Sequence, residues 1–192
     1  SEYMSRAGLD ALVIRGAAAA PVWLEVSPDR VRFHSAEDLW GLDTYDTEER
    51  VKAWVRQNRP ESGRCGVVCI GPAGENRVVF SVVENDSWRS AGRTGAGAVM
   101  GSKKIKAVAF RGKQRKRFFD APRLKDFSRG FHQEYRHHAV VQSYRNNGTP
   151  MLVDIMNEVG GFPTRYWSRG RSDHRDQINA AALHSRCEVE PH

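Results

Sequence analysis

The stretch of residues 85–103 holds four glycines within ten positions, and this spacing limits the folds open to the chain more than any other feature. Glycine takes positive φ at no steric cost and lets another group approach closely, which indicates a tight turn or a close packing contact. Arg89 and Arg93 frame the first half of the stretch. Arginine forks and consecutive backbone N–H groups both bind phosphate oxygens, so the stretch is typical of a loop for a phosphorylated ligand. The four glycines are Gly92, Gly95, Gly97 and Gly101.

The glycine spacing leaves two interpretations open. It is not G-x-G-x-x-G, because Arg93 and Thr94 separate the first two glycines, and the P-loop pattern G-x-x-x-x-G-K-[ST] is absent. If residues 95–101 begin a short helix, its first free N–H groups add to the positive field at the loop. The structural alternative is a glycine-rich turn that packs a helix tightly on a sheet.

The chain is basic, with 30 Lys and Arg residues against 23 Asp and Glu residues in 192 and a net charge of +7. Such a surplus favours anionic partners: phosphates, an acidic protein or nucleic acid. Apart from clusters at residues 103–106 and 111–117 the basic residues are scattered, and no nucleic-acid-binding motif accompanies them. A non-catalytic basic α+β module that binds a phosphorylated ligand or nucleic acid is the alternative function, although we expect no nucleic acid.

The spacing of the cysteines and histidines predicts no metal site. Three cysteines, an odd number, argue against a disulfide framework, and Cys65 and Cys69 in their apolar run are predicted as buried thiols of a reduced compartment. His132 and His137 are five residues apart, which separates their rings around a helix. No apolar run approaches the length of a membrane span and no signal peptide leads the chain, so we expect a cytoplasmic protein without membrane contact.

Short apolar runs between turn residues predict that residues 1–112 are β-rich. Six strands are expected, at 9–15, 22–26, 31–34, 65–71, 77–83 and 105–112. The first three are expected to form an antiparallel meander, and the last to close the sheet. A helix that ends before Gly8, a helical turn at residues 36–41 and a helix from Asp46 or Thr47 to Asn58 complete this part.

Composition shifts at Lys113, and beyond it only helical patterns occur. We place a linker at residues 113–121 and the start of a helical domain at residues 122–192, with helices at 122–138, 149–158 and 176–187. Residues 162–171 are predicted to form an aromatic and basic loop. The predicted class is α+β: a β-rich domain with mixed or antiparallel sheets and a few helices, followed by an all-helical segment.

The glycine-rich stretch also carries a family resemblance. Residues 89–108 resemble the signature of the tungsten-containing aldehyde:ferredoxin oxidoreductase family, and three further stretches agree in the same order, at residues 6–16, 70–76 and 147–165. The resemblance covers nearly the whole chain. Family members are considerably longer, so the chain is expected to be an internal fragment, the second half of the N-terminal domain and the start of the helical domain.

The resemblance implies an oxidoreductase that oxidises aldehydes to carboxylic acids with ferredoxin as electron acceptor. The implied cofactors are a metal, normally tungsten, held by two pterins that a magnesium ion joins, and a four-iron–four-sulfur cluster. The cluster cysteines and the catalytic carboxylate and histidine are expected outside this chain, so no catalytic residue is nominated and the isolated chain is expected to be inactive. A homodimer of the complete protein is also implied.

The resemblance further implies that residues 1–112 are the C-terminal part of a pterin-cofactor-binding domain, and it implies which residues contact the pterin. Arg89, Ser90, Gly92 and Arg93 match the segment of the family that contacts the pterin, and Gly95 continues it. The backbone carbonyl of Ser90 matches one that positions the magnesium. Serine replaces the alanine expected there, which matters little if the backbone makes the contact.

Overall fold

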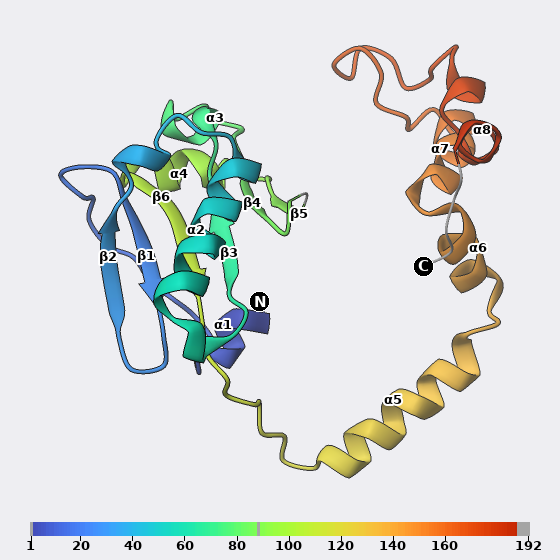
Figure 1. The fold of residues 1–192 in the computed structure, drawn as a ribbon. Helices are drawn as coiled ribbons and strands as arrows, with labels where there is room; N and C mark the ends of the chain where they lie inside the picture. The colour runs from blue at the N-terminus through green and yellow to red at the C-terminus, as the bar shows by residue number, and fades with distance from the viewer. Residues whose placement is uncertain (1, 88, 188–192) are drawn as a thin grey trace. The chain divides into compact units, whose positions relative to one another are not determined.

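The core of the first part of the chain is a six-stranded mixed sheet, seen in a computed structural model that describes residues 2–87 and 89–187 (Figure 1). The strand order is β2-β1-β6-β3-β4-β5. Strands β1 and β6 run parallel, whereas the other neighbouring pairs run antiparallel. The predicted α+β class, a β-rich part followed by a helical part, is confirmed. The strands are β1 (Val22–Val26), β2 (Val31–Ser35), β3 (Gly66–Cys69), β4 (Val83–Asn85), β5 (Arg89–Ala91) and β6 (Ile105–Phe110).

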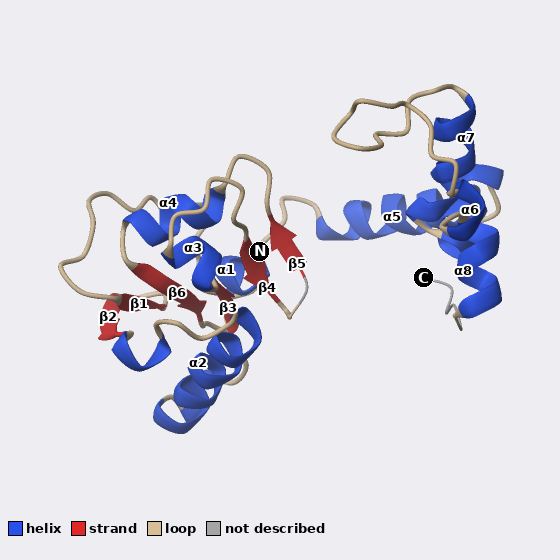
Figure 2. Cartoon of the chain, turned by 90° about the horizontal axis from the view of Figure 1, so that it is seen from above, coloured by secondary structure: helices blue, strands red, loops and turns tan. Residues whose placement is uncertain are grey.

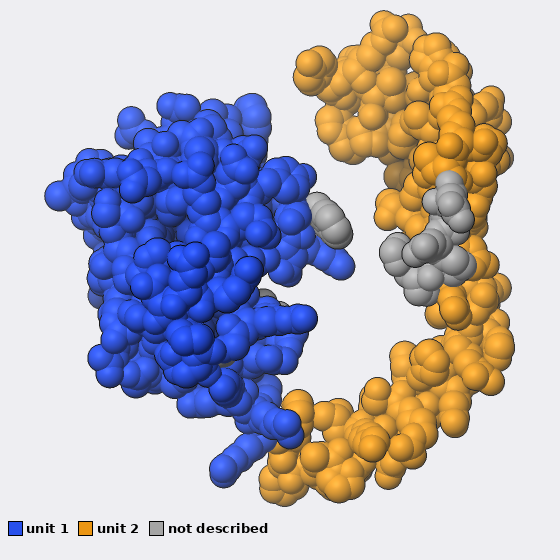
Figure 3. Space-filling view, in the orientation of Figure 1, with its two compact units in different colours: residues 1–117 blue, residues 118–192 orange. Residues whose placement is uncertain are grey.

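The chain divides into two units, residues 1–117 and 118–192, shown in blue and orange in Figure 3. The division falls inside the predicted linker of residues 113–121. The role of residues 1–112 as a cofactor-binding domain stays a prediction. Trp88, within the glycine-rich stretch, lies outside the described residues.

Helices pack on both faces of the sheet, with α2 (Thr44–Asn58) on one side and α4 (Ala96–Ser102) on the other (Figure 2). The N-terminal cap of helix α2 is Asp43, whose side chain accepts the N–H of Asp46, and it lies three to four residues before the predicted caps, Asp46 or Thr47. Under α2 lies an apolar cluster that includes Trp23, Val51, Val55, Val67 and Ala107, and the opposite face carries Leu24, Val26, Ile105 and Val108.

Two predicted strands are wrong. Residues 9–15 form no strand in the described chain; Leu9, Leu12 and Ile14 instead pack on the apolar cluster around Leu24. Residues 77–82 follow the short helix α3 (Pro72–Glu75) and form turns and irregular structure, with Arg77 at φ +57°. Only Val83 lies in a strand. Local apolar character does not reveal whether a strand partner exists.

Strand β6 was expected to close the sheet, but it lies between β1 and β3. Its residues from Ile105 to Ala109 are all buried, including Lys106. The ammonium group of Lys106 donates to the Leu42 carbonyl at 2.7 Å and forms an ion pair with Glu75. Glu75 also accepts the backbone N–H of Gly41, so this carboxylate serves the fold.

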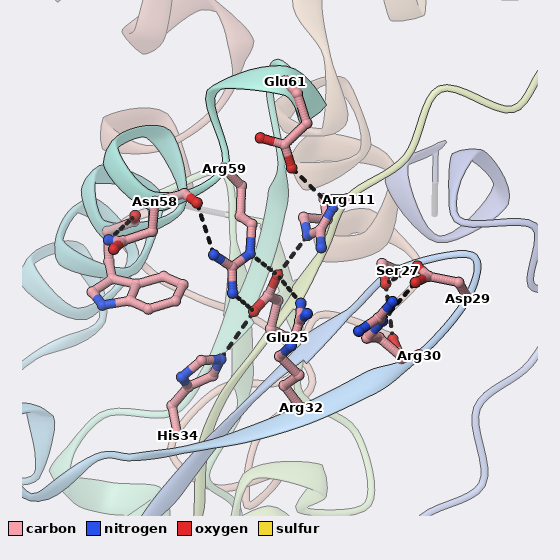
Figure 4. A network of polar contacts seen from close by, with 11 residues as sticks. Glu25, Ser27, Asp29, Arg30, Arg32, His34, Asn58, Arg59, Glu61 and Arg111 are labelled. Carbon is pink, nitrogen blue, oxygen red and sulfur yellow. Dashed lines mark hydrogen bonds and ion pairs between the residues drawn. The ribbon is translucent and has the colours of Figure 1, made fainter.

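A second buried carboxylate, Glu25 in β1, joins four elements (Figure 4). It accepts hydrogen bonds from Arg111 at 2.6 Å, Arg59 at 3.0 Å and His34 at 3.0 Å, and Arg32 lies 3.5 Å away. Burial alone raises the pKa of Glu25, but the hydrogen bonds from Arg111, Arg59 and His34 outweigh it and hold the pKa below the usual 4.5. The network stabilises the end of the sheet where β1, β2 and the residue after β6 meet α2.

In its described residues the second unit consists of helices joined by loops, with one isolated bridge between Thr164 and Arg169 and no strand. The helix predicted at 122–138 ends at Tyr135, because the His138 side chain caps a further helix that the sequence reading missed. None of the described helices is long and apolar enough to cross a membrane. The α-helices are α5 (Ala121–Tyr135), α6 (Ala139–Asn147), α7 (Leu152–Glu158) and α8 (Ala180–Arg186). Helix α1 (Glu2–Arg6) and the short 3₁₀ turns η1 (Glu37–Leu39), η2 (Pro60–Ser62), η3 (Thr149–Met151) and η4 (Arg175–Gln177) complete the chain.

We predict that Glu25→Gln lowers the free energy of unfolding at pH 7 by about 3–5 kcal/mol, because it removes the buried charge that pairs with several half-buried cationic side chains. Because the folded-state pKa of Glu25 is lowered, its contribution is fully present above pH 4.5 and is lost as the pH falls below that value. The variant should therefore lose stability less steeply on acidification below pH 4.5.

Urea unfolding between pH 3 and pH 7 measures both effects. Glu61→Gln is the matched control, because Glu61 is exposed and lies 3.8 Å from Arg111; its effect should stay within about 0.5 kcal/mol. Equal stability of the two variants would contradict the role of Glu25.

Candidate functional site

The candidate site residues lie on one edge of the sheet and in the turn that follows it. Arg89, Ser90 and Ala91 form the exposed edge strand β5, which pairs with β4 in the register Asn85 to Arg89 and Glu84 to Ser90. The chain then turns through Gly92–Thr94 into α4. The structure thus places all five predicted binding residues, from Arg89 to Gly95, in one continuous segment.

Close backbone packing accounts for three of the four glycines. A Cβ atom at Gly101 would lie 1.9 Å from the carbonyl oxygen of Gly74 in α3, and one at Gly95 would lie 2.0 Å from that of Val79. Gly97 likewise meets the carbonyl of Val82 at 2.5 Å. Real Cβ atoms do not come so close to backbone atoms, so only glycine lets α4 lie against residues 74–82. At these three positions the glycines therefore serve tight packing of a helix, which is the structural alternative that the sequence left open.

The amide groups at the start of α4 are partly used within the protein. Gly95 donates its N–H to the Gly92 carbonyl, and Gly97 donates its N–H to the Ser81 carbonyl, both at 3.1 Å. Helix α4 has seven residues, so its dipole is short. The anion-binding capacity of the segment therefore depends on side chains more than on the helix end.

Two guanidinium groups supply that capacity. The side chains of Arg89 and Arg93 are exposed, and within the described chain neither has a carboxylate partner. Arg59 and Arg111, in contrast, are both bound to Glu25. Unpaired arginines in a glycine-rich turn are suited to phosphate, which a guanidinium holds with two parallel hydrogen bonds.

Two buried oxygen atoms beside this segment have no hydrogen-bond partner in the described structure: Oγ of Ser81 and Oε2 of Glu84. The other oxygen of Glu84 accepts a 2.5 Å hydrogen bond from the Ser90 hydroxyl. A buried carboxylate oxygen without a donor favours a bound water or cation nearby. The sequence reading missed both residues, since nothing in the local pattern of residues 80–85 indicates a contact with Ser90.

The lysines of the basic cluster at residues 103–106 make contacts within the fold. Lys103 donates to the Gly16 carbonyl at 3.0 Å, Lys104 to the Ala19 carbonyl at 2.7 Å, and Lys106 is buried in the ion pair with Glu75. These contacts fix the connection that precedes β1. The observation weakens the alternative of a nucleic-acid-binding module.

The cysteines of the sheet behave as buried thiols. Cys65 and Cys69 are buried on the face beneath α2, and burial raises the pKa of both, for Cys69 to about 12. A thiol with so high a pKa is a poor metal ligand at neutral pH. Among residues 2–87 and 89–187, no group of three or more His, Cys, Asp or Glu side chains is placed to hold a metal ion.

Comparison with protein families matches nearly the whole chain. Residues 1–112 match the family model described as aldehyde ferredoxin oxidoreductase, N-terminal domain. Residues 126–192 match the model described as aldehyde ferredoxin oxidoreductase, domains 2 and 3.

Individual relatives agree with the family match. The tungsten-containing aldehyde ferredoxin oxidoreductase of Thermococcus kodakarensis is 36% identical over 178 residues, 92% of this chain and 29% of that protein. An aliphatic sulfonate oxidoreductase, WOR-like subunit, of Pyrococcus furiosus is 33% identical over 182 residues, 90% of this chain and 29% of that protein. The solved active-site complex BamBC of benzoyl coenzyme A reductase matches with a TM-score of 0.65 at 25% identity, over 95% of this chain and 28% of that one. The chain spans less than a third of the length of each.

We predict that Gly101→Ala destabilises the protein by about 1–3 kcal/mol, because the added methyl group overpacks the contact with the Gly74 carbonyl. Gly130→Ala in α5 is the control: nothing lies within 4 Å of its Cβ position, and alanine in a helix interior stabilises by about 0.5–1 kcal/mol relative to glycine. Thermal unfolding followed by circular dichroism measures the stability of both variants. A Gly101→Ala variant as stable as the wild type would refute the packing account.

Proposed function

Because the chain belongs to the aldehyde ferredoxin oxidoreductase family, we propose that Arg89, Ser90, Gly92, Arg93 and Gly95 bind the phosphate end of a tungsten–bis-pterin cofactor. The complete enzyme oxidises aldehydes to carboxylic acids and passes the electrons to ferredoxin. One observation carries the proposal: two exposed arginines in the glycine-rich segment lack a carboxylate partner in the described chain.

The residues present fit a phosphorylated cofactor. Arg89 and Arg93 supply charge-assisted donors. Gly92 is suited to the turn between them, since a Cβ there would lie 2.9 Å from the Val82 side chain. The orphaned Oε2 of Glu84 lies in the residue that binds Ser90, and magnesium prefers such oxygen ligands. These contacts support Ser90 as the position whose backbone carbonyl faces a magnesium ion.

Each residue of the segment has a separate task in this proposal. The guanidinium groups of Arg89 and Arg93 neutralise the phosphate and fix its orientation. The Ser90 hydroxyl is bound to Glu84, and we assign its backbone carbonyl to the cation because the family resemblance implies it. The glycine contacts hold α4 against residues 74–82, and this keeps the turn in one conformation.

The bound tungsten and pterins supply the redox chemistry, and the protein supplies binding and orientation. We assign no catalytic residue to this chain, because the family resemblance implies that the catalytic groups lie outside it. We also assign no iron–sulfur ligand: Cys65 and Cys69 are buried thiols with raised pKa values, and Cys187 belongs to no group of three or more metal-binding side chains in the described residues. The four-iron cluster, ferredoxin binding and a homodimer belong to the complete protein, as the family resemblance implies. The aldehyde substrate is proposed from the name of the tungsten-containing relative of Thermococcus kodakarensis.

We predict that Arg89→Ala in the complete protein lowers retention of tungsten and pterin at least about tenfold, because each charge-assisted hydrogen bond contributes about 1.5–3 kcal/mol. Arg89→Lys should retain an intermediate amount, since it keeps the charge but loses the fork. Elemental analysis and pterin fluorescence of the purified proteins measure this.

The control is Arg15→Ala, which removes an exposed arginine outside the segment and should retain the cofactor fully. Wild-type tungsten and pterin in both Arg89→Ala and Arg93→Ala proteins would overturn the assignment of the site.

A further inference from the structure

A buried carboxylate on α2 holds the turn that precedes Arg89. Glu48 is 2% exposed. Its Oε1 accepts the backbone N–H of Asp86 at 3.0 Å, and its Oε2 accepts that of Ser87 at 2.9 Å. These residues are separated from Glu48 by 38 and 39 positions in the sequence. Both oxygens of one carboxylate therefore bind consecutive amides of the β4–β5 turn.

The turn depends on this anchor for two reasons. Asp86 has φ +50° and Ser87 has φ +67°, and non-glycine residues adopt this left-handed conformation at a cost. Strands β4 and β5 have three residues each, β5 is at the sheet edge, and β4 is joined to β3 by only two residue pairs. A ribbon this short is marginally stable by itself. Without the carboxylate, the position of Arg89 would be poorly fixed.

The charge of Glu48 is balanced one helical turn away. The ammonium group of Lys52 lies 2.6 Å from Oε1 of Glu48. Burial lowers the pKa of Lys52, but its hydrogen bond to Glu48 outweighs this and leaves the pKa above 10.5. The lysine therefore stays charged, and its ammonium group balances the charge of the carboxylate that accepts both amides.

We propose that Glu48 is a positioning residue for the candidate phosphate site: its carboxylate fixes the Asp86–Ser87 turn and thereby the placement of Arg89 and Ser90. The inference rests on the proposed function, because it gives Glu48 a task only if Arg89 binds phosphate. The proposal adds Glu48, a residue on helix α2, to the candidate site, which the sequence alone limits to the segment from Arg89 to Gly95.

A positioning role of Glu48 and a purely electrostatic effect of its charge predict opposite changes in phosphate affinity. Removing a negative charge near an anion site strengthens anion binding through the field alone. Removing the anchor of the turn weakens it, because the guanidinium group of Arg89 is no longer held in place. Glu48→Gln therefore distinguishes the two effects by the sign of the change in phosphate affinity.

The experiment uses the 192-residue chain and inorganic phosphate as the probe, with binding and amide exchange both followed by NMR. Glu48→Gln should accelerate exchange of the Asp86 and Ser87 amides, leave exchange in β1 and β6 unchanged, and weaken phosphate binding about fivefold or more. Glu49→Gln, an exposed neighbour on α2, should change neither. Adding Ser87→Gly to Glu48→Gln relieves the left-handed strain and should recover part of the affinity.

Two further variants make every outcome decisive. Glu48→Asp keeps the charge but is one methylene shorter, and it takes the place of Glu48→Gln if that protein does not fold. If Arg89→Ala weakens phosphate binding and the Glu48 variants leave it unchanged or stronger, the positioning role is wrong and the proposed function stands. If Arg89→Ala has no effect, or the wild type does not bind phosphate, the proposed site fails and the role of Glu48 fails with it.

Discussion

The backbone contact between α4 and residues 74–82 is the constraint on which the candidate site depends. Gly95 and Gly101 bring the helix so close that a single methyl group would collide with a carbonyl oxygen. This contact fixes the end of the turn that carries Arg93, while Glu48 fixes the turn that precedes Arg89. The segment between them is thus held at both ends by the protein, and its exposed arginines remain available to a ligand. Rigid support with free charged groups is the arrangement that a preorganised phosphate site requires.

The division of tasks within the fold agrees with this account. The buried ion pairs, Glu25 with its arginines and Lys106 with Glu75, tie the sheet to α2 and α3 and take no part in the site. Relatives named for aldehyde oxidation and for aliphatic sulfonate oxidation both match about 90% of the chain. Relatives with such different names can share this segment if its role is the one proposed, cofactor binding, because the cofactor supplies the chemistry and the protein orients it.

Local chemistry in the sequence predicted some of these features and missed others for a physical reason. Short apolar runs between turn residues identified β1 and β2, and the glycine spacing identified the tight turn before α4. The segment of residues 9–15 has the apolar content of a strand but no strand partner in the described chain, which only the tertiary structure decides. Glu48 and Glu84 were missed because their partners are backbone or hydroxyl groups that no local pattern links to them. The binding role of Arg89, Ser90, Gly92, Arg93 and Gly95 stays a proposal.

The most direct test is a crystal structure of the complete protein purified with its cofactor. The account predicts a phosphate oxygen of the pterin within hydrogen-bonding distance of the Arg89 guanidinium group, and a magnesium ion facing the Ser90 carbonyl. It also predicts that the Glu48 carboxylate still accepts the Asp86 and Ser87 amides. A cofactor whose phosphates are bound elsewhere, with Arg89 in solvent, would contradict the central claim.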